Sequence, residues 1–413
     1  MVLGFPIAIS LGVASLSYLV FSDIPLIIIP QRLYSGIDVF VLLSIPGFIL
    51  AGNLMNQGGI TKRIVDFSNA MVGHIRGGLG LANIVGSMVF AGISGTAVAD
   101  SASLGAVLIP AMKDEGYEAD FSCAVTASSS TIGPIIPPSL PMIVAGTLTG
   151  LSVGRLFVAG IIPGLLLGLG LMTVSYTISV KRGHPIGQRK AFREVVRTFG
   201  SAFWALLMTA IILFGIIGGV FTPTEASIVA SAYALIIGLF VYRGFTLRDL
   251  PRIILESAVT TASIMVLVGL ANLFAWIMVS EGVPRMLADA ILSVSNNPII
   301  VLLLINLLLL IVGMFMETIS ALLILFPVLL GLATQIGIHP IHFAMIVVLN
   351  LMIGLTTPPM GVCLFITSSI GKISLWQISK AILPFLGVSL VVLMLVTFVP
   401  EISLFLPELL FNR

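Results

Sequence analysis

Polar residues that could bind a cation occur at matching places in the two halves of an otherwise apolar chain. Each half places an acid, Asp100 or Glu317, within apolar sequence, and further on a segment rich in Gly and Pro, 133–138 or 354–359. Proline removes a backbone donor and breaks a helix, so these segments leave carbonyl oxygens unpaired. Carbonyl and hydroxyl oxygens are the hard ligands that suit an alkali cation. The residues therefore indicate cation binding.

An internal duplication accounts for these matching places. At a spacing of 217 the chain pairs Pro6 with Pro223, Gly52 with Gly269, Asp100 with Glu317, Ser101 with Thr318, Ser103 with Ser320 and Pro110 with Pro327. With an insertion of four residues before Gly337 the spacing becomes 221, which pairs Gly116 with Gly337, Gly133 with Gly354, Pro137 with Pro358 and Pro163 with Pro384. Only 22 of the 413 residues are proline, so chance does not explain these matches. A duplicated apolar chain interrupted at matching places is typical of a secondary transporter with its site at the interruptions.

The composition is that of a polytopic membrane protein. Hydrophobic residues make up 58% of the chain and charged residues 9%, whereas about a quarter of a soluble domain is charged. Apolar stretches of membrane-spanning length lie at 1–21, 36–56, 155–180, 200–221, 224–242, 255–280 and 374–399. The chain has no phosphate-binding loop with its lysine, which excludes nucleotide hydrolysis, and its two cysteines lack metal-ligand spacing. We expect no cofactor other than a coupling ion.

The basic residues predict the orientation. Six cations in the linker 181–197 place it in the cytoplasm, and the same topology puts 15 of the 19 Lys and Arg residues on that side. An odd number of crossings per repeat inverts the second copy. A hairpin at 80–112 then opens to the cytoplasm and a hairpin at 299–337 to the opposite face, so that their tips meet near the midplane. The expected fold is therefore all-α, with an inverted-topology repeat, two re-entrant hairpins and two discontinuous helices, 118–150 and 340–370.

The candidate site consists of the hairpin tips and the helix breaks. In the first half it contains Gly92, Ser94, Gly95, Thr96, Asp100, Ser103, Ser129, Thr131, Gly133, Pro134 and Pro137. In the second half it contains Met316, Glu317, Thr318, Ser320, Asn350, Gly354, Thr356, Thr357 and Pro358. The residues predicted to hold one sodium ion in each half are Gly95, Thr96 and Gly133, and Thr318, Gly354 and Thr356. The stretches 60–76 and 283–296 are predicted as amphipathic surface helices.

Four motifs together resemble the large membrane subunit of tripartite ATP-independent periplasmic (TRAP) transporters. They are the segments that begin at Gly92, Ser128 and Gly219, and the Thr-Thr-Pro-Pro-Met-Gly segment that ends at Gly361. The resemblance implies a sodium-driven elevator in a bacterial inner membrane that imports an organic acid such as a C4-dicarboxylate or sialic acid. It also implies two partners, a small four-helix membrane subunit and a periplasmic binding protein that delivers the solute; no nucleic acid is expected.

This interpretation divides the chain into scaffold and transport parts. Scaffold is expected at 1–75 and 198–296, transport parts at 76–180 and 297–399, the linker at 181–197 and a C-terminal tail at 400–413. By the 217 spacing, helix 200–217 has no counterpart in the chain. Either a first helix is missing from this sequence, or a fused or neighbouring subunit supplies it; we expect a second membrane polypeptide or a fused upstream segment to pack near residues 1–56.

Three alternatives to this interpretation are a related symporter, a channel and a protease. A stand-alone sodium-coupled anion symporter would share the fold but need no partner. A channel would need a continuous polar pore, whereas the polar residues here cluster at one depth. The sequence Gly92-Ile-Ser94-Gly95 matches the pattern around the nucleophile of an intramembrane serine protease, but such an enzyme also needs a base at membrane depth, and no histidine is predicted there.

Overall fold

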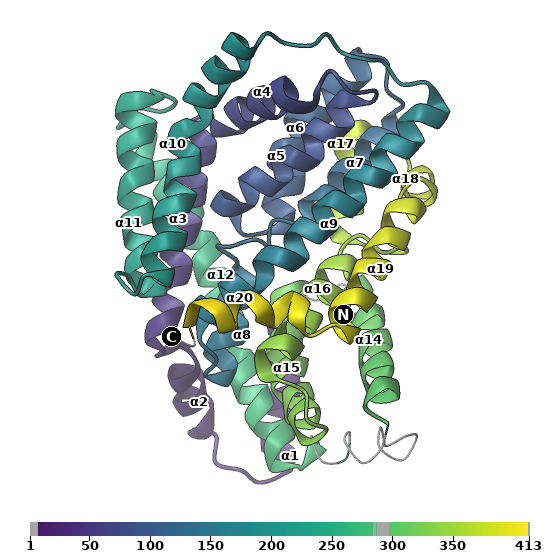
Figure 1. The fold of residues 1–413 in the computed structure, drawn as a ribbon. Coiled ribbons are helices and arrows are strands. Elements are labelled where there is room, and N and C mark those ends of the chain that lie inside the picture. Colours follow the sequence, from purple (N-terminus) through teal and green to yellow (C-terminus); the bar gives the residue numbers. More distant parts are fainter. Residues whose placement is uncertain (1–6, 284–285, 287–296, 412–413) are drawn as a thin grey trace.

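The structure is a computed structural model that describes residues 7–283, 286 and 297–411, and this part of the chain is almost entirely helical (Figure 1). Its first half contains α1 (Ile7–Phe21), α2 (Ile28–Ile37), the 3₁₀ turn η1 (Phe40–Leu43), α3 (Ser44–Gln57), α4 (Ile60–Val72), α5 (Gly78–Ser94), α6 (Ala97–Asp114), α7 (Ala119–Ser130), α8 (Leu140–Thr149) and α9 (Val153–Arg182). Its second half contains α10 (Phe192–Ile217), α11 (Pro223–Ile236), the π-helical turn η2 (Ile237–Val241), α12 (Leu250–Ser280), α14 (Pro298–Phe315), α15 (Thr318–Gln335), α16 (Pro340–Gly354), α17 (Val362–Gly371), α18 (Leu375–Ala381), α19 (Leu383–Phe398) and α20 (Glu401–Phe411).

Several of these helices are long and apolar enough to cross a membrane. In the described residues there are seven, or up to nine if each sharply bent pair of helices counts as one span. They include the predicted spans that became α9, α10 and α12, of 30, 26 and 31 residues. The chain is a multi-pass membrane protein.

The helices of the predicted scaffold pack on one another. Helix α3 packs on α11, α2 and α1 pack on α12, and α10 packs on α4. The surface helix predicted at 60–76 is α4, whereas most of the stretch 283–296 lies outside the described residues. This assembly forms a wall against which the hairpins lie.

The two predicted hairpins are present. Helices α5 and α6 turn at Gly95, whose φ of +63° suits glycine, and α14 and α15 turn at Met316 and Glu317. The first hairpin begins beside the linker, because the Gly77 amide donates to the carbonyl of Pro185. The second hairpin lies at the opposite end of the molecule in Figure 1.

The two discontinuous helices are present as well. Helix α7 ends at Ser130 and α8 begins at Leu140, while α16 ends at Gly354 and α17 begins at Val362. Each break contains a cis bond between its paired prolines, Pro137-Pro138 and Pro358-Pro359. Backbone that leaves the helix at membrane depth is tolerated only inside protein or beside water. The first break is almost wholly buried, whereas Pro359 and Met360 of the second break are exposed.

The duplication has a different register from the predicted one across the hairpins. Helices α6 and α15 both have 18 residues, and the tips Gly95 and Met316 match at the 221 spacing. The pairing of Asp100 with Glu317 at a spacing of 217 is therefore wrong, as are the neighbouring pairs up to Pro110 and Pro327. Glu317 corresponds to Thr96, and both side chains cap the second helix of their hairpin.

Two predicted boundaries also change. The non-helical part of the linker is only Gly183–Ala191, because α9 continues through Arg182 and α10 begins at Phe192. The segment expected as a C-terminal tail is the helix α20, which packs across α9. Ser403 of α20 hydrogen-bonds to the buried His342 of α16 at 2.7 Å, so α20 connects the two repeats.

Candidate functional site

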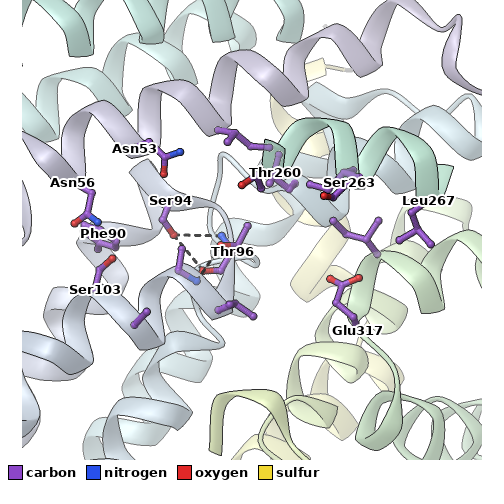
Figure 2. Close-up of a pocket in the computed structure, with 18 residues that line it drawn as sticks. Asn53, Asn56, Phe90, Ser94, Thr96, Ser103, Thr260, Ser263, Leu267 and Glu317 are labelled. Atoms are coloured by element: carbon purple, nitrogen blue, oxygen red, sulfur yellow. Dashed lines mark hydrogen bonds between the residues drawn. The ribbon is translucent and has the colours of Figure 1, made fainter. Parts of the chain in front are cut away.

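A cavity of about 490 Å³ lies between the scaffold helices α3 and α12 and the tips of both hairpins (Figure 2). Four of the residues predicted for the site line it: Ser94, Thr96, Ser103 and Glu317. The first three come from the first hairpin and Glu317 from the tip of the second. The two tips therefore face one space, as the inverted repeat predicts.

Hydrogen bonds fix the tip of the first hairpin. The Ser94 hydroxyl contacts the Asp100 carboxylate, and the Thr96 amide donates to Ser94 Oγ at 3.3 Å. Thr96 Oγ1 in turn accepts from the Ala99 amide at 3.3 Å, which caps α6. A methyl group on Gly95 would lie 2.8 Å from the carbonyl oxygen of Pro138, so the tip packs directly on the first helix break.

Asp100 lies behind this tip and is fully buried. Its Oδ1 is bonded to Ser94, but its Oδ2 has no hydrogen-bond partner in the described residues. Gly133 of the helix break approaches Oδ2 so closely that a methyl group there would overlap it, and the Ser130 carbonyl is adjacent. An unpaired carboxylate oxygen beside a helix break has the chemistry of a cation site.

The tip of the second hairpin is built differently. Glu317 Oε2 accepts from the Ser320 amide at 3.1 Å, and the same carboxylate lines the cavity. The hydroxyl of the next residue, Thr318, is buried without a hydrogen-bond partner in the described chain. This hairpin packs on its own helix break through Gly313 and Gly354, whose backbones leave no room for a side chain.

The scaffold contributes polar residues that sequence reasoning missed. They are Asn53 and Asn56 on α3 and Thr260 and Ser263 on α12, which Figure 2 shows around the tip residues. Asn53 Nδ2 donates to Ser257 Oγ at 2.8 Å, and Asn56 Oδ1 accepts from Thr61 at 2.8 Å. Each pair is spaced three residues apart within an apolar span, which places both members on one helix face. That spacing is a signal that could have found them.

Other predicted residues lie away from the cavity. Gly92 is in contact with Thr209 of α10, whose hydroxyl donates to the Gly92 carbonyl at 3.1 Å. Pro134, Pro137 and Pro358 shape the breaks. The hydroxyls of Thr131, Thr356 and Thr357 bond to helix carbonyls one turn back, and Ser320 takes part in the Glu317 cap. Met316 ends α14 at the second tip.

Ser129 and Asn350 join each broken helix to its hairpin and do not line the cavity, and Asn350 Oδ1 is buried without a hydrogen-bond partner in the described residues. Ser129 Oγ donates to Asn83 Oδ1 at 3.0 Å on α5. Asn350 Nδ2 donates to Asn306 Oδ1 at 2.7 Å and to the Asn306 carbonyl at 3.0 Å on α14. In both repeats a polar contact with the first helix of the hairpin holds the broken helix.

We expect Asn350→Ala to lower stability without changing ion affinity. The substitution removes both hydrogen bonds to Asn306, and such bonds between membrane helices contribute about 1 kcal/mol. A thermal unfolding scan should therefore show a lower midpoint, while the sodium concentration for half-maximal uptake stays at the wild-type value. A large rise in that concentration would instead return Asn350 to the ion site.

The chain matches the model of one transporter family over nearly its whole length. The family model described as "Tripartite ATP-independent periplasmic transporter, DctM component" matches residues 1–402. The chain belongs to this family. As a DctM-component protein it is one of the transporter permeases and not a member of an enzyme family, and its place is the inner membrane.

Relatives of this DctM-component protein carry several substrate names. The sialic acid TRAP transporter large permease SiaM of Vibrio cholerae is 44% identical over 98% of this chain and 95% of its own length. The C4-dicarboxylate TRAP transporter large permease DctM of Rhodobacter capsulatus is 38% identical over 99% of this chain and 97% of its own. The isethionate TRAP transporter permease DctMQ of Oleidesulfovibrio alaskensis is 42% identical, and the match covers 98% of this chain but 64% of that longer protein.

The fold of this DctM-component protein also occurs in a solved structure. The YdaH transporter of Alcanivorax borkumensis superposes with a TM-score of 0.62 over 91% of this chain and 88% of its own, at 15% identity. At that identity the similarity concerns the fold alone.

The geometry around Ser94 does not match a protease nucleophile. Its hydroxyl contacts the Asp100 carboxylate and the Thr96 carbonyl, and none of the four histidines hydrogen-bonds to it in the described structure. A serine nucleophile needs a base within hydrogen-bond reach that accepts its proton and then holds it for a leaving group. Asp100 instead holds Ser94 as part of the tip.

Proposed function

We propose that this permease couples uptake of a small organic acid to sodium, and that a periplasmic binding protein delivers the solute. The observation that carries the proposal is the charge of the cavity. Its lining includes the Glu317 carboxylate and, among the described residues, no Lys, Arg or His. Asp100 adds a second carboxylate directly behind the first tip.

An organic anion cannot enter such a cavity alone. Two unit charges of like sign 4 Å apart repel by about 4 kcal/mol at the effective dielectric constant of a protein surface, and by more at depth. No basic side chain lines the cavity in the described structure. The positive charge that offsets this repulsion must therefore enter together with the solute. Bound sodium ions supply it, and this requirement makes uptake depend on sodium.

The two halves offer different oxygen ligands for these ions. In the first half they are the unpaired Asp100 Oδ2 and the backbone of the break at Gly133, with Gly95 and Thr96 at the facing tip. In the second half they are the unpaired Thr318 Oγ1 at the tip and the backbone of the break from Gly354 to Thr356. The first site carries a formal charge of its own and the second does not, so we expect the first to bind sodium more tightly.

The relatives indicate the class of solute and the partners. Sialic acid, C4-dicarboxylates and isethionate, which appear in their names, are all organic anions. The remaining third of the longer DctMQ relative leaves room for a fused subunit. The lipid-facing side of the scaffold has exposed apolar residues where such a subunit can pack, among them Val13 and Val20 of α1.

The position of the cavity supports an elevator motion. It extends from the tips to Asn56, close to the end of α3 from which α4 starts, and the positive-inside rule assigns that end to the cytoplasm. A second cavity of about 210 Å³ follows α12 in the other direction, between Asn272 on the scaffold and Pro327 on α15. We propose that the transport part moves along α12 between these two cavities.

Reconstitution tests the proposal. The chain and its small membrane subunit are placed in liposomes, the binding protein is supplied outside, and uptake of a labelled solute is followed with and without an inward sodium gradient. We expect uptake only with the gradient and with both partners. Full sodium-driven uptake by this chain alone would establish the stand-alone symporter. Uptake that is indifferent to sodium would exclude both the stand-alone symporter and the sodium-coupled transporter that needs partners.

A further inference from the structure

A third cavity, of about 630 Å³, lies at the end of α3 that the positive-inside rule assigns to the cytoplasm, and it is lined by Gly59, whose amide donates to the carbonyl of Asn56 in the solute cavity. It is bounded by α4, which lies crosswise beside the first turns of α10 in Figure 1. Its charged residues are Lys62, Arg63, Asp66, Lys190, Glu194 and Arg197. Four cations against two carboxylates leave a net positive cavity on the side that faces the cytoplasmic leaflet.

The four cations differ in how they are engaged. Arg63 is held by the scaffold, since it donates to the carbonyls of Gly58 and Gly59 and lies 4.0 Å over the Tyr242 ring. Lys190 forms an ion pair with Glu194, with 3.1 Å between Nζ and Oε1. Lys62 and Arg197 have no acidic partner within 4.0 Å in the described part of the chain, so these two can bind an anion.

An apolar strip continues from this cavity toward the membrane core. Gly200 follows Arg197 on α10 and has no atom within 4 Å of the place where a side chain would begin. Trp204, two helical turns after Arg197 and on the same face, is 37% exposed. Phe203, whose ring lies 5.6 Å from that of Trp204, is 39% exposed. A ligand that fits both features has an anionic head and an apolar tail.

We infer that this cavity binds the phosphate headgroup of an anionic phospholipid such as phosphatidylglycerol. Lys62 and Arg197 contact the phosphate, and one acyl chain lies along α10 past Gly200 and Trp204. Basic pockets between membrane helices on the cytoplasmic side bind such headgroups because each nearby Lys or Arg adds electrostatic attraction to the anionic lipid. The lipid would fill the angle between α4 and α10 and so hold the scaffold still while the transport part moves.

Native mass spectrometry of the detergent-purified chain tests this inference. Phosphatidylglycerol or phosphatidylcholine is titrated and the dissociation constant of the tightest lipid is measured. We expect the double variant Lys62→Gln with Arg197→Gln to bind phosphatidylglycerol about 30-fold more weakly, with phosphatidylcholine unaffected. Asp66→Asn removes a repelling charge from the same cavity, so we expect it to bind phosphatidylglycerol about fivefold more tightly.

The control variant also removes two positive charges, but from another place on the side assigned to the cytoplasm. Arg248→Gln with Arg252→Gln lies at the start of α12, and we expect wild-type affinity for phosphatidylglycerol. Equal weakening by the control and by the cavity variant would overturn the inference, as would unchanged binding in the cavity variant. Displacement of the lipid by inorganic phosphate or glycerol 3-phosphate at equal concentration would show a site for free phosphate instead, and would also overturn it.

Discussion

Asp100→Asn is expected to abolish most sodium-driven uptake while the protein still folds. The asparagine keeps the size of the side chain and can keep its contact with the Ser94 hydroxyl, so the first tip retains its shape. It removes the negative charge whose free oxygen, Oδ2, faces Gly133. Loss of an outer-shell partner of a metal ligand already costs 10–100-fold in affinity, so loss of a charged ligand should cost at least roughly 100-fold.

The measurement is the sodium dependence of initial uptake in proteoliposomes. The half-saturating sodium concentration should rise beyond the accessible range in Asp100→Asn. Glu317→Gln is the matched comparison, because its amide oxygen can still accept from the Ser320 amide and cap α15. We expect Glu317→Gln to impair uptake less than Asp100→Asn does, because the Glu317 carboxylate already accepts a hydrogen bond from the Ser320 amide. A half-saturating concentration that Asp100→Asn leaves unchanged would remove Asp100 from the ion site.

Gly354→Ala is expected to disable the second half of the site. A methyl group at Gly354 would lie 2.6 Å from both Cα and the carbonyl carbon of Gly313, so it meets backbone that no side-chain rotation can relieve. The second hairpin would have to move away from its helix break, and overpacking of this kind costs about 1–3 kcal/mol. We therefore expect a lower thermal midpoint together with weaker sodium dependence.

Gly331→Ala provides the control on α15 of the same hairpin. No atom lies within 4 Å of a methyl group there, and alanine favours a helix over glycine by up to about 1 kcal/mol. Its uptake should match the wild type and its thermal midpoint should stay or rise. If both glycine variants behaved alike, the close approach of Gly313 and Gly354 would have no role in transport.

The sequence predicted the elements of the site but not how they fit together. The Gly and Pro breaks could be found because their backbone chemistry is local and is repeated in both halves. The predicted register of the hairpins is wrong because Pro110 and Pro327 are both proline at the 217 spacing but do not occupy equivalent positions in α6 and α15. In the structure Thr96 corresponds to Glu317, because each caps the second helix of its hairpin. The sequence does not reveal this match, since a threonine and a glutamate are different residue types.

The scaffold side of the cavity could not be located from the duplication. Asn53 and Asn56 reach the site only because α3 packs beside the first hairpin, which is a long-range contact that no repeat spacing encodes. Ser129 and Asn350 match at the 221 spacing as predicted, but the spacing does not say which residues they contact. Their side chains hydrogen-bond to α5 and α14, while Asn350 Oδ1 is buried without a partner in the described residues.

Sodium that travels with the solute is proposed to supply the positive charge that the described cavity walls lack. The most direct test is to measure the influx of ²²Na⁺ and of a labelled organic acid at the same time, in liposomes that contain the complete transporter. With one ion in each half, we expect at least two sodium ions to enter with each solute molecule, and Asp100→Asn to stop both fluxes together. Solute influx with no accompanying sodium would rule out sodium coupling.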